Sequence, residues 1–262
     1  WVSLKETYMK ITACIETIEQ AQNILELLSA LQFTNIHIDF VFVSEMLEMT
    51  DFLIVAANSP LTKILSSYHE LQWELGKNLL GQAKSLALQR SFSVTTHFLT
   101  GNISQSILEF SASSAYDMIA LAAIEKKSLG GILIGSVTRK IIITSDRSVL
   151  IARRQTNAAG ELSGVLATDH SEYGNLCFDL LNKHLPTGLR KLIVTTVYPE
   201  KLSEILGHNL GHFKADIPGW IREELQNANS RLIERLGWLE CSFVSLVEEG
   251  AVNEVLDRVM AN

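Results

Sequence analysis

The feature that most constrains this chain is a regular alternation of short apolar segments with longer amphipathic ones along its whole length. A continuous apolar run of a few residues indicates a buried strand, and apolar residues three and four apart indicate a helix with one buried face. Strands that alternate with helices in this way are typical of a mostly parallel sheet covered by helices on both faces. The pattern therefore predicts an α/β, doubly wound fold.

The first 154 residues contain one complete set of these elements. We expect five strands, at residues 10–15, 36–43, 92–99, 117–123 and 148–152. We expect helices between them, at residues 17–31, 66–89, 103–113 and 132–143. Five strands with helical crossovers over about 150 residues make one doubly wound domain of ordinary size. Residues 1–154 are therefore predicted to form a complete domain.

The order of elements begins again after residues 155–162, a polar and aperiodic segment that reads as a linker. Three more strands are expected at residues 164–168, 191–197 and 243–247, with helices at 172–185, 221–236 and 251–261. Gly250-Ala251-Val252 follows its strand as Gly101-Asn102-Ile103 does in the first set. We therefore expect a second copy of the domain at residues 163–262 that lacks its last two strands.

Charge and hydropathy exclude two classes of partner. The net charge is −7, and no basic run is longer than Arg153-Arg154, so nucleic acid and anionic membrane surfaces are unsuitable ligands. The longest apolar runs, such as residues 52–57, are far shorter than the about 20 residues that span a bilayer. No secretory signal pattern is present. We expect a cytoplasmic protein without direct membrane insertion.

Side chains that commonly carry catalysis or hold metals are scattered. The three cysteines form no C-x-x-C pair, and the apolar neighbours of Cys14 and Cys177 suit small buried residues. His208 and His212 come nearest to a zinc-binding spacing, but they lie in a stretch that we expect to be irregular. No histidine is close to Ser136 in the sequence. We predict no catalytic residues, and no metal other than magnesium accompanying a nucleotide.

Residues 117–153 resemble the C-terminal segment of universal stress proteins. In that family a D-L-I-V-M-G strand leads to a glycine-rich loop, a G-S helix start and a final P-V-L-V-V strand. Here Gly135-Ser136-Val137 matches the helix start, and Ser148–Ala152 matches the last strand. Asp169-His170-Ser171-Glu172 is similar to the D-G-S-E that ends the family's first strand. The resemblance covers nearly the whole chain and implies an adenine-nucleotide-hydrolase-like fold in two repeats.

The resemblance also implies a nucleotide site beyond the carboxyl ends of the first and fourth strands, where the strand order reverses. Backbone N–H groups in a glycine-rich loop and at a helix N-terminus would bind the phosphates there. The family's nucleotide-binding members carry the pattern G-x2-G-x9-G-S/T, whose first two glycines are replaced here by Ala122 and Glu125. A carboxylate at Glu125 would oppose a polyphosphate.

An acidic residue after the first strand would accept hydrogen bonds from the ribose or the adenine. Glu16 holds this position in the first repeat, where it is either a ligand contact or a helix-start residue that favours the dipole. Asp169 holds it in the second repeat, as a ligand contact, a helix cap, or both. The predicted nucleotide-binding residues are Glu16, Val41, Ala122, Ala123, Glu125, Gly135, Ser136 and Asp169.

As a function, the resemblance implies a cytosolic regulatory module of the stress response. It would sense ATP, AMP, a cyclic dinucleotide or a related small molecule, and it would act as a homodimer paired through the edge strand Ser148–Ala152. Two alternatives stay open. The chain could be the cytosolic regulatory tail of a cation or proton transporter to which it is fused, or a weak ATPase.

Overall fold

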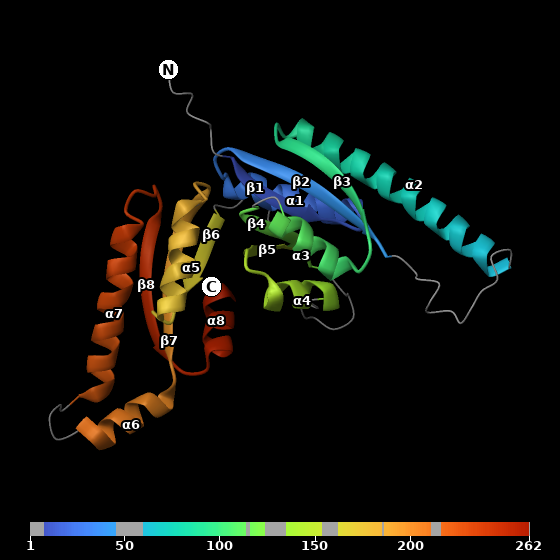
Figure 1. Ribbon diagram of the computed structural model, residues 1–262. Coiled ribbons are helices and arrows are strands. Elements are labelled where there is room, and N and C mark those ends of the chain that lie inside the picture. The colour runs from blue at the N-terminus through green and yellow to red at the C-terminus, as the bar shows by residue number, and fades with distance from the viewer. Residues whose placement is uncertain are drawn as a thin grey trace. The chain divides into compact units, whose positions relative to one another are not determined.

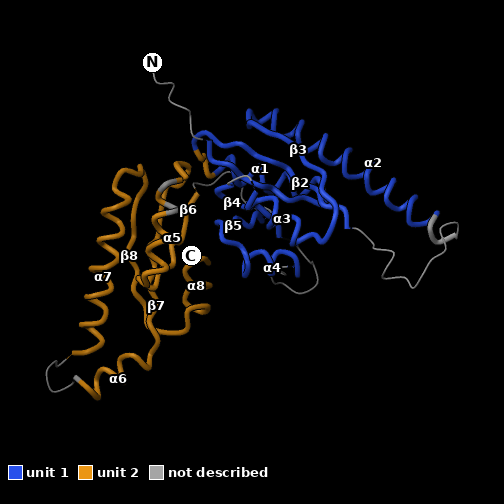
Figure 2. The backbone as a smooth tube through the Cα atoms, in the orientation of Figure 1, with its two compact units in different colours: residues 1–30, 34–158 blue, residues 31–33, 159–262 orange. Residues whose placement is uncertain are grey.

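The structure is a computed structural model that describes residues 8–45, 60–113, 116–123, 135–153, 162–184, 186–210 and 216–261. The chain divides into two compact units (Figure 2). Unit 1 comprises residues 1–30 and 34–158, and unit 2 comprises residues 31–33 and 159–262. The main division thus falls inside the segment that the sequence predicts as a linker.

Unit 1 contains a five-stranded sheet in which every neighbouring pair is parallel (Figure 1). Its strands are β1 (Met9–Cys14), β2 (Ile36–Ser44), β3 (Ser93–Thr100), β4 (Met118–Ala122) and β5 (Ser148–Ala152). The order is β3-β2-β1-β4-β5. The predicted fold class is confirmed, and the strand order reverses between β1 and β4, where the sequence predicts the switch point.

Helices cover both faces of this sheet. They are α1 (Ile18–Leu31), α2 (Pro60–Gln89), α3 (Ile103–Ser113) and α4 (Ser136–Thr144). On one face, Val41 and Ile119 of the sheet form a core with Ile107 of α3 and Ile141 of α4. The neighbouring residue Phe42 points to the opposite face, where it contacts α2. α2 begins at Pro60 rather than at residue 66, because proline is well suited to the first turn of a helix.

Unit 2 contains a parallel three-stranded sheet in the order β6-β7-β8. The strands are β6 (Leu162–Ala167), β7 (Leu189–Tyr198) and β8 (Ser242–Glu249). The helices are α5 (Glu172–Lys183), α6 (Glu200–Leu210), α7 (Ile217–Arg235) and α8 (Val252–Ala261). Among the described residues, β6 is an end strand that pairs only with β7.

α6 occupies a stretch that the sequence pattern indicates to be irregular, so that prediction is wrong. Gly207 lowers the helix propensity of this segment. Packing overrides that preference, because Leu202 and Leu206 lie against the core cluster formed with Tyr198 and Ile221. α7 likewise begins at residue 217 instead of 221, capped by the Asp216 side chain, which accepts a hydrogen bond from the Gly219 backbone N–H at 2.9 Å.

The two sheets repeat the same hydrogen bonds beyond the ends of their first strands. The Ile15 N–H donates to the Val41 carbonyl in unit 1, and the Thr168 N–H donates to the Thr195 carbonyl in unit 2, both at 3.0 Å. The matching bonds identify β6 as the equivalent of β1, and β7 as the equivalent of β2. Glu16 and Asp169 each follow one of these residues, so the two acidic side chains occupy equivalent positions.

The glycines that the sequence pairs are also equivalent in the structure. The Gly101 N–H donates to the Ser44 carbonyl, and the Gly250 N–H donates to the Tyr198 carbonyl, both at 3.0 Å. Their φ angles are 131° and 147°, a region that only glycine enters without strain. Each glycine therefore makes the turn from the strand before it, β3 or β8, into the helix that follows.

The exposure of the cysteines was predicted only in part. Cys14 is buried as expected, whereas Cys177 of α5 is exposed, so the expectation for Cys177 is wrong. Among the described residues, no helix combines the length and the apolar character that crossing a membrane requires.

Candidate functional site

The carboxyl ends of β1 and β4 border a cavity of about 240 Å³ in unit 1. Residues from β1, β4, α1, α3 and α4 line it: Cys14, Glu16, Gln20, Ile103, Leu121, Ala122, Gly135, Ser136, Val137 and Thr138. The structure thus places four of the predicted residues, Glu16, Ala122, Gly135 and Ser136, around one space. They come from three separate regions of the sequence.

The N-terminus of α4 faces this cavity. Gly135 is the N-cap, and no side chain of the described residues caps the helix through a hydrogen bond. The first N–H groups of an α-helix have no partner inside the helix, and they carry its positive partial charge. A Cβ atom placed on Gly135 would meet no heavy atom of the described residues within 4 Å. The arrangement suits a bound anion.

Glu16 is not needed to cap α1. The Gln20 N–H donates to Thr17 Oγ1 at 3.3 Å, and Gln20 Oε1 accepts from the backbone N–H groups of Glu16 and Thr17 at 2.6 and 3.2 Å. Thr17 and Gln20 together form a capping box. Thr17 and Gln20 therefore make the capping hydrogen bonds at the start of α1, and the Glu16 carboxylate lines the cavity.

A second cavity of about 510 Å³ shares Glu16 and Ile103 with the first. Its lining combines apolar groups with side-chain amides: Glu16, Ile18, Phe42, Val43, Glu45, Tyr68, Gln72, Leu75, Asn78, Leu79, Gln82 and Ile103. Glu16 thus borders both the cavity at the α4 N-terminus and this second space. A ligand with an anionic end, hydroxyl groups and a flat ring would match all three features.

Cys14 is the one thiol in the lining of the first cavity. Burial raises its pKa to about 12, and the negative charge of Glu16 contributes to the same shift. The thiol is therefore protonated at neutral pH and is a poor nucleophile. No histidine is among the described residues that line this cavity.

Two of the predicted residues of unit 1, Val41 and Ala123, are not among the described residues that line this cavity. Val41 is fully buried in the core, and its carbonyl is occupied by the Ile15 N–H. The Ala123 N–H donates to the Ala152 carbonyl at 2.8 Å, so it joins β4 to β5. Glu125 lies outside the described residues.

The sequence profile of the universal stress protein family matches residues 7–153, more than half of the chain. The chain belongs to this family. A universal stress protein from Archaeoglobus fulgidus DSM 4304 matches 98% of this chain and 85% of its own at 16% identity, with a TM-score of 0.62. That similarity extends through both units and concerns the fold alone.

Two further solved structures match about half of the chain. A family protein from Arabidopsis thaliana with AMP bound is 13% identical and covers 56% of this chain and 93% of its own, with a TM-score of 0.36. A universal stress protein in complex with cAMP gives the same identity, coverage of 56% and 97%, and the same TM-score. No curated protein is similar enough in sequence to count as a relative.

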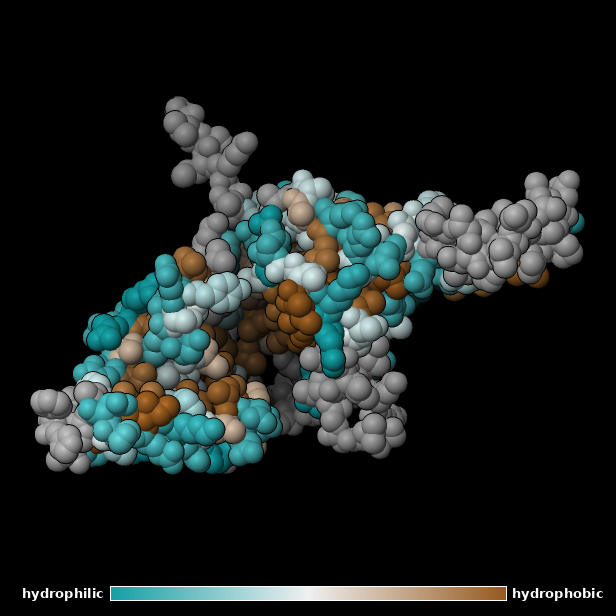
Figure 3. Space-filling model, turned by 60° about the horizontal axis from the view of Figure 1, so that its bottom comes forward, coloured by the Kyte–Doolittle hydropathy of each residue, from teal (hydrophilic) through white to brown (hydrophobic). Residues whose placement is uncertain are grey.

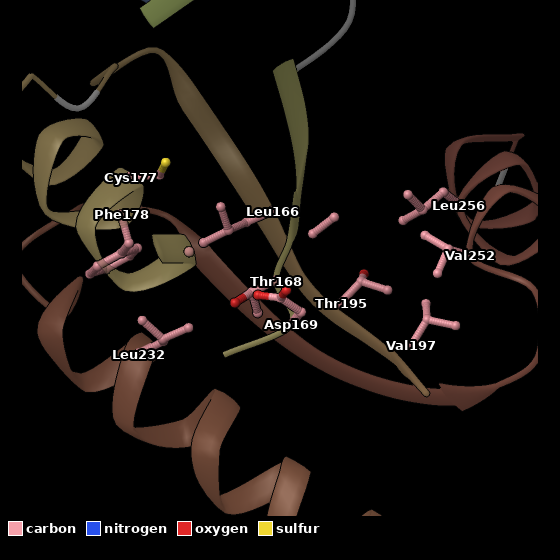
Figure 4. Close-up of a pocket in the computed structure, with 12 residues that line it drawn as sticks. Leu166, Thr168, Asp169, Cys177, Phe178, Thr195, Val197, Leu232, Val252 and Leu256 are labelled. Atoms are coloured by element: carbon pink, nitrogen blue, oxygen red, sulfur yellow. The ribbon is translucent and has the colours of Figure 1, made fainter. Parts of the chain in front are cut away.

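In unit 2, Asp169 lies just beyond the end of β6, as Glu16 lies just beyond β1 in unit 1. Asp169 Oδ1 accepts the Ser171 N–H at 2.9 Å, and these hydrogen bonds from Ser171 hold the pKa of Asp169 below its usual value. Ser171 Oγ accepts the Gly174 N–H at 3.0 Å and so caps α5. Asp169 also lines a cavity of about 330 Å³ (Figure 4). A capping turn and a cavity-lining carboxylate thus coexist here.

His170 replaces the glycine that the family has after this aspartate. Its φ angle is 56°, in the left-handed region, which explains why glycine suits the position. The ring compensates through hydrogen bonds, because Nε2 lies 3.0 Å from both Thr196 Oγ1 and Asn229 Oδ1. Burial lowers the pKa of His170. This network was not predicted from the sequence. The signal that could have indicated it is Asn229, a polar residue on the buried face of α7.

A second polar cluster that was not predicted lies on β2 and β3 of unit 1. The Asp39 carboxylate is 5% exposed, and it accepts hydrogen bonds from the Thr95 hydroxyl and from His97 Nε2, the latter at 2.7 Å. His37 Nε2 lies 3.6 Å from the same oxygen. Burial and a hydrogen bond to Asp39 raise the pKa of Tyr116. Within the described ranges, no three potential ligands are placed to hold a metal ion.

Proposed function

We propose that unit 1 binds an adenine nucleotide between β1 and β4 and acts in the cytoplasm as a ligand-sensing module of the stress response, rather than as an enzyme. One observation carries this proposal. The uncapped N-terminus of α4 and the carboxylate of Glu16 line one cavity at the switch point of a sheet that belongs to the universal stress protein family. Doubly wound sheets bind ligands at this place.

Each part of the site has a chemical counterpart in a nucleotide. The N–H groups at Gly135 and Ser136 would bind a phosphate, because a helix N-terminus attracts anions. Glu16 would accept hydrogen bonds from ribose hydroxyls, and the adjoining cavity would take the base among apolar groups and amides. Magnesium would come with the phosphates.

The departures from the family pattern favour a short phosphate group. Ala122 is 7% exposed and adds a methyl group to the rim of the cavity where binding members have glycine. A second lost glycine, at Glu125, removes another place where the backbone could approach a phosphate chain closely. We therefore expect AMP or a cyclic nucleotide to bind more tightly than ATP.

Calorimetric titration with AMP, ATP, cyclic AMP and cyclic dinucleotides tests the proposal. Gly135→Asp should weaken binding at least tenfold, since it places a carboxylate in the open space before the helix N-terminus. Gly207→Asp is the matched control, because a Cβ at Gly207 in α6 also meets nothing within 4 Å. Absence of heat with every nucleotide, or equal effects of both variants, would contradict the proposal.

We further propose a homodimer paired through β5. This strand ends the sheet of unit 1 and pairs only with β4 among the described residues, so one row of its backbone groups is available. The Ala152 carbonyl bonds to the Ala123 N–H and so points toward β4, which directs the Ile151 backbone to the open side. Ile151→Pro should give a monomer in sedimentation equilibrium. A chain that is monomeric before the substitution contradicts this proposal.

The alternatives are tested separately. The gene sequence upstream of Trp1 decides whether the chain is the regulatory part of a membrane transporter. Sensitive phosphate-release assays on the chain and on Gly135→Asp decide whether it hydrolyses ATP weakly.

A further inference from the structure

The polar cluster on β2 and β3 of unit 1 joins an exposed serine to the buried Asp39. In the register of the two strands, Ser93 is the partner of His37, and Thr95 is the partner of Asp39. Residues two apart in a strand share a face of the sheet, so these four side chains lie on one face. Ser93 and Thr95 are exposed, the His37 side chain is 24% exposed, and that of Asp39 is 7% exposed. The cluster therefore leads from the solvent to a buried carboxylate.

The Asp39 carboxylate sets the direction of each hydrogen bond in the cluster. An ionised carboxylate can only accept, so the Thr95 hydroxyl donates to Asp39 Oδ1. Because the Thr95 proton is used there, Thr95 Oγ1 accepts from His37 Nε2, which lies 3.2 Å away. In a neutral imidazole the other nitrogen then carries a lone pair, and the Ser93 hydroxyl donates to His37 Nδ1 over 2.7 Å. The cluster thus holds His37 in the tautomer that a base for Ser93 requires.

Asp39 has further partners that fix its position. His97 Nε2 lies 2.7 Å from Oδ1, and the His97 ring packs against Phe110 of α3 with their centroids 4.7 Å apart. Tyr116, which is 4% exposed, also forms a hydrogen bond with Asp39. A buried carboxylate that orients a histidine beside a serine is the arrangement of a Ser-His-Asp triad. Here the hydroxyl of Thr95 stands between the histidine and the carboxylate.

The backbone beside Ser93 provides a hydrogen-bond donor at the edge of the sheet. β3 is an end strand that pairs only with β2 among the described residues. The Gly101 N–H bonds to the Ser44 carbonyl of β2, so the alternation along the strand directs the backbone of Ser93 to β2 and the Val94 N–H to the open side. In serine acyl-transfer sites, the N–H of the residue after the nucleophile commonly stabilises the oxyanion. Val94 holds that position here.

We propose that Ser93 is an acylation site that takes an acyl group from an activated carboxylic ester, with His37 as the base. Ser93 Oγ forms a bond to the carbonyl carbon while its proton moves to His37 Nδ1. The bond from that carbon to the leaving oxygen then breaks, and the leaving group takes the proton from His37 Nδ1. The products are the chain esterified at Ser93, a neutral His37 and a free alcohol or phenol. This modification does not depend on nucleotide binding.

The surroundings of Ser93 favour a small acyl group. Its neighbours on the same face of the sheet, His37 and Thr95, are polar. Hydrophilic and apolar residues are mixed over the surface of unit 1 that Figure 3 presents, in the right part of the view. A long acyl chain is usually bound by a contiguous apolar surface. We therefore expect an acetyl group, or one of similar size, to be transferred.

Incubation of the whole chain with p-nitrophenyl acetate tests the proposal. We expect a burst of p-nitrophenolate equal to one molecule per chain, and mass spectrometry should locate one acetyl group on Ser93. Ser93→Ala should abolish the burst, and His37→Gln should slow it at least tenfold because the base is lost. Thr95→Val should also slow it, whereas Thr95→Ser, which keeps the hydroxyl, should restore the rate. That rescue distinguishes a positioning role of Thr95 from a merely structural one.

Ser85→Ala is the matched control, because Ser85 is exposed but its hydroxyl donates to the Gly81 carbonyl at 3.0 Å. Ser85 should stay unmodified, and its substitution should leave the burst unchanged. If Ser93→Ala retains the burst, an imidazole or another group is the nucleophile and the proposal is wrong. Equal acetylation of Ser85 and Ser93, or a rate that His37→Gln leaves unchanged, also overturns it. Circular dichroism verifies that each variant is folded.

Discussion

Unit 1 and unit 2 place a long helix on equivalent strands by different chemistry. In unit 1, α2 approaches the sheet at Gly76, where a Cβ atom on the glycine would lie only 2.6 Å from the rings of Phe42 and Phe98. In unit 2, α7 presents the fully buried Asn229 to Thr196 and His170. One contact is apolar and close, and the other is a hydrogen-bonded polar network.

The residues that follow β1 and β6 also differ in the partners that their side chains have. His170 requires partners for its ring on the α7 side, and Asn229 and Thr196 provide them. The equivalent residue in unit 1, Thr17, has no such obligation and caps α1 instead. The acidic residues that precede them, Asp169 and Glu16, are therefore held to different degrees: Asp169 is tied into its turn, and Glu16 lines a cavity beside the α4 N-terminus.

Removing the polar network around Asn229 should reduce stability more than any other change predicted here. Asn229→Ala leaves the carbonyls of Val194 and Leu246 without the side-chain N–H that now lies 3.4 and 3.3 Å from them, and it removes the acceptor for Thr196. We expect a loss of about 2–4 kcal/mol in unit 2. Hydrogen exchange measured separately for β7 and β2 gives the stability of each unit. Asn78→Ala, on the exposed side of α2, is the control, and a similar effect of both variants would contradict the network's importance.

The close contact in unit 1 should give a smaller effect. Gly76→Ala forces a methyl group against Phe42 and Phe98, so we expect a loss of about 1–3 kcal/mol from overpacking. Gly81→Ala in the same helix meets nothing within 4 Å and should stabilise unit 1 by about 0.5–1 kcal/mol. Urea denaturation of both variants measures the difference. If Gly76→Ala is also stabilising, α2 does not sit as closely on the sheet as the comparison requires.

The smallest effect that we expect is the dependence of the stability of unit 2 on pH through His170. Burial lowers the pKa of His170 in the folded state, with Arg231 adding to the shift and Asn229 and Asp169 opposing it. The unfolded chain therefore takes up this proton first as the pH falls, so unit 2 loses stability as the pH falls through about 6.5. His170→Asn keeps a residue that tolerates positive φ and should flatten this dependence. An unchanged pH profile of β7 exchange would exclude His170 as its source.

Much of the fold could be predicted because its signals are local. Continuous apolar runs indicated the eight strands, and the glycines at 101 and 250 marked equivalent turns because their positive φ angles favour glycine. α6 could not be predicted in this way, since Leu202 and Leu206 stabilise it through contacts with residues that follow later in the sequence.

The residues of the candidate site were likewise predicted only where the signal is local in the sequence. Gly135 and Ser136 were identified from a motif, and the structure adds that the N-terminus they form is uncapped and faces open space. The clusters around Asp39 and Asn229 were not identified, because each joins residues more than 25 positions apart.

The sequence by itself determined the strand–helix alternation, the family resemblance and the two acidic positions at the ends of β1 and β6, since each depends on neighbouring residues. Only the tertiary structure decided what surrounds those positions. Parallel pairing brings Glu16 next to the α4 N-terminus, more than a hundred residues away, and leaves Asp169 beside an edge where the described residues provide no further strand. Whether an acidic side chain faces a helix end or an open edge is set by strand order, which no local pattern encodes.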